Sequence, residues 1–149
     1  MRAYFFCNFY LSSIQQGIQS AHCMHEMFTK YRDVNTEPQT SVLYDWANNH
    51  KTMIVLNGGD SQSIAELYEL LAPLAKEGFF PFAKFSEDER SLNNALTCVG
   101  VVLPESIYDH DLKAELQTIQ YGVAADVGEI PLSFNGRFKQ LISQYHLAK

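Results

Sequence analysis

The sequence predicts an α/β domain: a three-layer α/β/α sandwich around a mixed, mainly four-stranded sheet, followed by a C-terminal helical extension. Strand-length apolar runs alternate with segments whose apolar residues recur every three or four positions, the spacing of amphipathic helices. The order strand, helix, helix, strand, helix, strand, strand requires at least one crossover connection. Some strand pairing must therefore be parallel, with helices packed on the faces of the sheet.

Each element has its own signal. Strands are predicted at residues 3–10, 51–56, 80–85 and 97–103 from short apolar runs bounded by polar or turn residues. Helices are predicted at residues 13–31, 41–49 and 63–78, the last opened by a capping box of Ser63 and Glu66. Two further amphipathic segments lie in the tail, around residues 112–119 and 134–145. We divide the chain into a domain of residues 1–104 and an extension of residues 105–149, packed on that domain or on a partner subunit.

Composition limits the function. The 149 residues, 46% of them hydrophobic, suffice for one well-buried domain. No apolar run approaches the roughly 20 residues that span a bilayer, so we expect a cytoplasmic protein without a membrane partner. Cys7, Cys23 and Cys98 are far apart in the sequence, which favours reduced thiols. A net charge of −6 repels a polyanion such as RNA unless basic residues cluster.

The first predicted helix carries the stretch GIQSAHCMHEMF, which contains two histidines and a cysteine. A burial stripe is expected at Ile14, Ile18, Ala21 and Phe28. His22 and His25 could share a metal with the neighbouring cysteine only awkwardly, because adjacent helical residues diverge by about 100°. We therefore expect no metal and no cofactor. The alternatives are a hydrogen-bonded histidine at the core edge for His25, and either a site residue or a solvated one for His22.

Several segments together resemble the type 2 peptidyl-tRNA hydrolases, the archaeal and eukaryotic kind. They are the stretch GIQSAHCMH after the first strand, W followed by KTMIVLN, the segment AKEGFFPF, and EDERS before CVGVVLP. The resemblance covers roughly residues 3–104. In the family motif Gly-Lys-x-Ala-Ala-Gln-x-x-His, Gly17, Ala21 and His25 match. Its lysine is replaced by Ile18 and its glutamine by His22.

The second family motif, Asp-Ala-Gly-Arg-Thr, falls on residues 87–91. Arg90 is retained, while the catalytic aspartate is replaced by Glu87 and the threonine by Ser91. The resemblance implies catalytic roles for Glu87 and Ser91 if the protein is active. An isoleucine cannot replace an ammonium group, and losing such an electrostatic partner commonly costs catalysis about 3 kcal/mol or more.

Three functions therefore remain open. We favour a binding module that holds a small nucleotide-like ligand or a tRNA end without efficient turnover, such as a sequestering protein encoded by a virus. The alternatives are an active peptidyl-tRNA hydrolase and a structural interaction domain. The family resemblance also implies a homo-oligomer. The ligand-binding residues predicted from the polar start of the first helix and the third-strand loop are Gln15, Gln16, Gly17, Gln19, His22, Arg90, Asn93 and Asn94.

Overall fold

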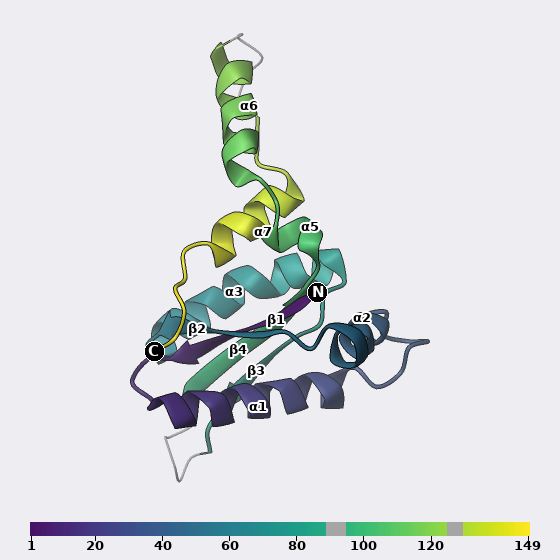
Figure 1. The fold of residues 1–149 in the computed structure, drawn as a ribbon, viewed down its shortest axis with the longest axis vertical. Helices are drawn as coiled ribbons and strands as arrows, with labels where there is room; N and C mark the ends of the chain where they lie inside the picture. The colour runs from purple at the N-terminus through teal and green to yellow at the C-terminus, as the bar shows by residue number, and fades with distance from the viewer. Residues whose placement is uncertain (89–94, 125–129) are drawn as a thin grey trace. The chain divides into compact units, whose positions relative to one another are not determined.

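The protein contains a four-stranded mixed sheet with helices, so the predicted α/β class is confirmed (Figure 1). The computed structural model describes residues 1–88, 95–124 and 130–149. The strand order is β2-β1-β4-β3, with β1 parallel to β2 and antiparallel to β4, and β3 antiparallel to β4. The strands are β1 (Arg2–Asn8), β2 (Met53–Gly59), β3 (Phe82–Ser86) and β4 (Leu96–Leu103).

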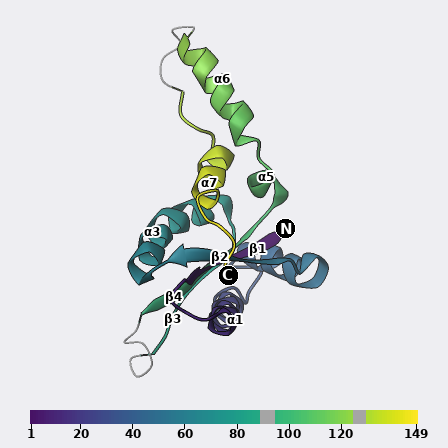
Figure 2. The ribbon, with the colours of Figure 1, turned by 60° about the vertical axis from the view of Figure 1, so that its left-hand side comes forward.

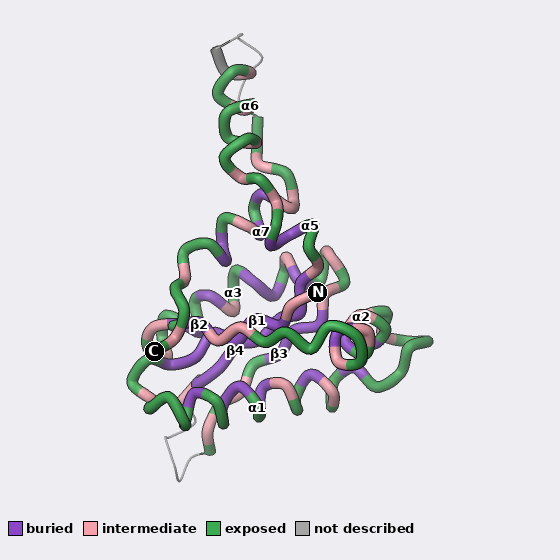
Figure 3. Tube along the Cα trace, in the orientation of Figure 1, coloured by how far each residue is buried: buried purple, intermediate pink, exposed green. Residues whose placement is uncertain are grey.

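The sheet has helices on both of its sides. Helices α1 (Ser13–Lys30) and α3 (Ser61–Gly78) lie on opposite sides of it (Figures 1 and 2). The two central strands, β1 and β4, are therefore buried along almost their whole length (Figure 3). This burial explains why both strands read as continuous apolar runs without alternation.

Helix α1 buries a different face from the one expected. Ile14 is 76% exposed and Ile18 is 43% exposed, and Ala21 is also exposed, so the predicted burial stripe is wrong except at the partly buried Phe28. The buried residues of α1 are Gln16, Gln19, Ser20, Cys23 and Met27. The apolar pattern misled because two glutamines and a serine lie in the interior, where hydrogen bonds offset their desolvation.

Helix α3 begins earlier than expected. Its N-cap is Asp60, whose carboxylate accepts a hydrogen bond from the Ser63 amide at 2.8 Å. The predicted capping box of Ser63 and Glu66 is therefore wrong, because Asp60 supplies the capping acceptor one turn sooner. Helix α2 (Gln39–Asp45) continues into a π-helical turn, η1 (Trp46–His50).

The chain divides into two compact units, Met1–Leu103 with Tyr145–Lys149, and Pro104–Gln144. The second unit holds helices α5 (Glu105–Tyr108), α6 (Leu112–Ala124) and α7 (Phe134–Ile142). The last five residues belong with the sheet, since Leu147 forms an antiparallel bridge with Leu56 of β2. None of the described helices is both long and apolar enough to cross a bilayer.

Candidate functional site

A buried polar network joins α1 to the ends of β3 and β4. The Thr97 hydroxyl donates to Gln19 Oε1 at 2.7 Å, and Gln19 Nε2 donates to Glu87 Oε2 at 2.8 Å. Gln19 is 2% exposed and Thr97 is fully buried. Both ends of the Gln19 amide are thus fixed, and its NH2 group is directed at the carboxylate.

The local fold places Glu87 at the end of this network. Glu87 directly follows β3, and its backbone amide donates to the Ala95 carbonyl at 3.0 Å, next to the start of β4. Within the described residues, no group donates to its other oxygen, Oε1. Glu87 therefore has one oxygen held by a neutral amide and one able to accept a further hydrogen bond.

His22 lies on the same side of α1 as this network. Its ring stacks on Phe85 with centroids 4.5 Å apart and an interplanar angle of 9°. His22 is exposed, whereas Phe85 is partly buried. The stacked pair and Glu87 together form what we call the α1/β3 edge, defined by Gln19, His22, Phe85, Glu87 and Thr97.

The predicted site residues separate into groups. Gln19 and Glu87 are brought together, and His22 lies nearby on the same helix. Gln15 and Gly17 are exposed on α1, but Gln16 is buried, with its Nε2 donating to the Leu11 carbonyl at 2.9 Å. The prediction that Gln19 lies on the exposed polar face of α1 is wrong, because its side chain is buried. Four predicted residues lie outside the described residues: Arg90, Ser91, Asn93 and Asn94.

Thr97 and Phe85 are the members of the edge that sequence reasoning missed. The sequence predicts Thr97 as the first residue of an apolar strand, and a hydroxyl at that position does not indicate a buried acceptor. Phe85 had the spacing of a core strand residue. A threonine at the start of a buried strand, beside a predicted site loop, is the signal that could have found the network.

The two histidines and the cysteine of α1, His22, His25 and Cys23, do not form a cluster of metal ligands. Within the described residues, no three His, Cys, Asp or Glu side chains gather as a metal site would require. His25 is exposed, so the expectation of a core-edge histidine is wrong. Cys23 points inward instead, and its thiol donates to the Ala83 carbonyl at 3.4 Å.

The three cysteines, distant in sequence, share the interior of the first unit. Cys7 and Cys98 face each other across β1 and β4 with their sulfurs 3.6 Å apart. All three thiols are free and fully buried. Burial raises the pKa of Cys98, which keeps it in the unreactive thiol form.

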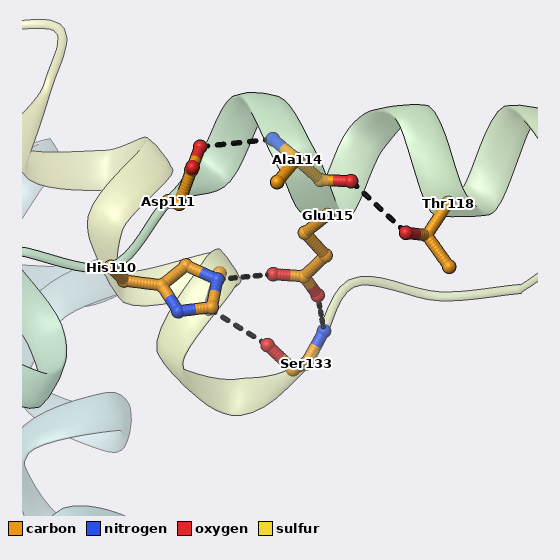
Figure 4. A network of polar contacts seen from close by, with 7 residues as sticks. His110, Asp111, Ala114, Glu115, Thr118 and Ser133 are labelled. Atoms are coloured by element: carbon orange, nitrogen blue, oxygen red, sulfur yellow. Dashed lines mark hydrogen bonds and ion pairs between the residues drawn. The ribbon is translucent and has the colours of Figure 1, made fainter.

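A second convergence of titratable groups lies in the second unit (Figure 4). Glu115 Oε2 lies 2.5 Å from His110 Nε2, and Glu115 Oε1 accepts from the Ser133 amide at 2.5 Å. The hydrogen bond from the Ser133 backbone amide lowers the pKa of the Glu115 carboxyl, and it does so more than the contact with His110. The Ser133 hydroxyl accepts from the Gly136 amide as the N-cap of α7. The arrangement is a helix cap and not a nucleophilic triad, because the hydroxyl is directed at the helix.

Neither the protein-family models nor the curated proteins include a match to this chain. The α/β fold and the α1/β3 edge are therefore the basis for a functional proposal.

Proposed function

We propose that the protein is a binding module of peptidyl-tRNA hydrolase-like design, which holds a small nucleotide-like ligand or a tRNA end without efficient turnover. The proposal rests on the order of elements, on the resemblance of residues 3–104 to the type 2 hydrolases, and on the α1/β3 edge. A homo-oligomer is part of the same proposal, since members of that family form homodimers.

A single observation carries the proposal: among the described residues, the hydrogen-bond partner of the Glu87 carboxylate is the neutral Gln19 amide. A general base for ester hydrolysis works best beside groups that stabilise the developing negative charge. The position at which the resembling family has its lysine holds Ile18, whose side chain is 43% exposed. The α1/β3 edge thus has a fixed hydrogen-bond acceptor, the Glu87 carboxylate, but it has no cation at position 18.

Such an edge suits recognition of a nucleotide-like molecule. The free oxygen of Glu87 is suited to accept from a ribose hydroxyl or an exocyclic amine, a role that acidic residues have in dinucleotide-binding folds. The exposed ring of His22, held parallel to Phe85, offers a surface for stacking a base. Arg90, Asn93 and Asn94 complete the proposed ligand set with Gln15 and Gly17. The acidic net charge favours a small ligand over a long polyanion.

Turnover of peptidyl-tRNA tests the catalytic half of the proposal. The unmodified protein should release little or no peptide, and Ile18→Lys should increase the release by restoring a cation. Ile18→Leu is the matched control, because it changes the same exposed position without adding charge. Robust release by the unmodified protein, abolished by Glu87→Gln, would establish the alternative, an active hydrolase using Glu87 and Ser91.

A further inference from the structure

A cavity of about 550 Å³ lies in the first unit, apart from the α1/β3 edge. Its lining comes from the end of β1, the start of α1, the end of β2 and the C-terminal segment. The lining residues are Phe9, Gln16, Asn57, His146, Leu147, Ala148 and Lys149. Since β2 and β3 are the two outer strands of the sheet, this cavity and Glu87 lie at opposite edges. Carboxyl ends of parallel strands, here β1 and β2, are common places for ligands.

Backbone hydrogen bonds fix the walls of the cavity. The Asn57 amide donates to the His146 carbonyl at 2.8 Å, and the Ala148 amide donates to the Val55 carbonyl at 2.9 Å. The Phe9 amide donates to the Gly59 carbonyl at 3.0 Å, which ties the β1 end to the β2 end. The C-terminal segment is thus an ordered wall of the cavity, paired to β2 like an added strand.

Gln16 shows that the cavity has unused hydrogen-bonding capacity. The residue is 6% exposed, and its Nε2 is bonded to the Leu11 carbonyl. Within the described residues, no group donates a hydrogen bond to Gln16 Oε1. Among these residues, Thr40 Oγ1 is the only side-chain polar atom that is both inaccessible to solvent and without a hydrogen-bond partner, so Gln16 Oε1 is accessible. Gln16 lines the cavity, and we infer that its unpartnered Oε1 faces the cavity space. A buried amide oxygen without a donor is a recognition group for a ligand N–H.

The remaining lining groups define the rest of the ligand. Phe9 is 45% exposed and packs against Tyr10 with ring centroids 4.0 Å apart, which gives a braced aromatic surface. Lys149 supplies a positive charge and His146 an imidazole, both suited to an anionic oxygen. Leu147 and Ala148 add apolar surface.

We propose that this cavity is a second binding site, which takes a small anion carrying a planar ring with N–H donors, the class to which nucleoside monophosphates belong. The ring lies against Phe9 and donates to Gln16 Oε1, and the phosphate contacts Lys149 and His146. This inference goes beyond the proposed function, because it assigns a site that shares no residue with the α1/β3 edge.

Isothermal titration calorimetry of the full chain with AMP tests the inference, with adenosine and inorganic phosphate as partial ligands. AMP should bind more tightly than either part. Lys149→Ala and His146→Ala should each weaken AMP binding at this site by roughly tenfold, as expected for losing a hydrogen bond to a charged group. Lys149→Arg, which keeps the charge, should retain most of the affinity. Both residues are exposed, so the variants should fold, which thermal denaturation checks.

Matched variants at the other edge, His22→Ala and Glu87→Gln, separate this inference from the proposed function. Two binding events, each lost with its own pair of variants, support both. Binding lost only with the Lys149 and His146 variants supports the cavity and contradicts the proposed edge. Binding lost only with the His22 and Glu87 variants, or unaffected by all four, overturns the cavity site. Absence of AMP binding overturns it as well.

Discussion

Removing the Thr97 hydroxyl should destabilise the protein by breaking the buried hydrogen-bond network of the candidate site. In Thr97→Val the side chain keeps its shape, but Gln19 Oε1 loses its donor at 2.7 Å and stays buried. An unsatisfied buried acceptor costs about 1–3 kcal/mol. For a chain of this size, a loss of about 2 kcal/mol lowers the melting temperature by roughly 5 °C.

Thr40→Val is the matched control for this prediction. Thr40 is 5% exposed, and its hydroxyl is the buried side-chain group that lacks a hydrogen-bond partner among the described residues. The same substitution there removes an unsatisfied polar group, and should therefore be neutral or stabilising. Chemical denaturation of both variants measures the difference in unfolding free energy. Equal losses in the two variants, or a larger loss for Thr40→Val, would refute the network.

Four further predictions concern packing, titration and the accessibility of the thiols. Gly100→Ala should destabilise the fold by about 1–3 kcal/mol, because the new Cβ would lie 2.6 Å from Met27 Cε and 3.0 Å from both Cys23 Sγ and Phe5 Cδ1. Gly17→Ala should instead stabilise it by about 0.5–1 kcal/mol, since no atom lies within 4 Å and alanine favours the helix; denaturant titration of both variants that gave the reverse order would contradict the packing. Burial raises the pKa of Tyr31 to about 12, so its neutral phenol stabilises the fold fully below pH 10, its ordinary pKa, and this contribution is lost as the pH rises towards 12. Burial also raises the pKa of Tyr68 and of Tyr145, so ultraviolet titration should show several late tyrosines, one fewer in Tyr31→Phe. An unchanged titration curve would exclude the assignment. Finally, the three thiols should react with a thiol reagent slowly in the native protein and quickly in denaturant, whereas rapid native labelling would show that they are accessible.

The sheet could be predicted from the sequence because buried strands leave an apolar run that needs no partner to be recognised. Each of the four predicted strands overlaps an observed one, with ends displaced by up to three residues. The pairing of Leu147 with Leu56 could not be predicted from the sequence, because a single bridge to an edge strand leaves no periodic pattern of apolar residues. Helix α5, with four residues, is too short to show a period.

The candidate site was harder to predict, because it depends on polar side chains in the interior. Gln16 and Gln19 are buried and Ile14 and Ile18 exposed, the opposite of what hydrophobicity predicts for α1. Only the tertiary partners, Leu11 for one glutamine and Glu87 with Thr97 for the other, make that burial favourable. Sequence reasoning puts Gln19 in the ligand-binding set and Glu87 in the catalytic set, but it does not predict the hydrogen bond between them.

The most direct test of binding without turnover uses a peptidyl ester of adenosine, a small mimic of a peptidyl-tRNA end that avoids repulsion of a long polyanion. Nuclear magnetic resonance of the full chain follows the protein amides and the ester bond in the same sample. The account predicts saturable shifts at the amides of Gln19, His22 and Glu87 while the ester remains intact. Ester cleavage that requires the protein, or the absence of shifts at these three amides, would contradict it.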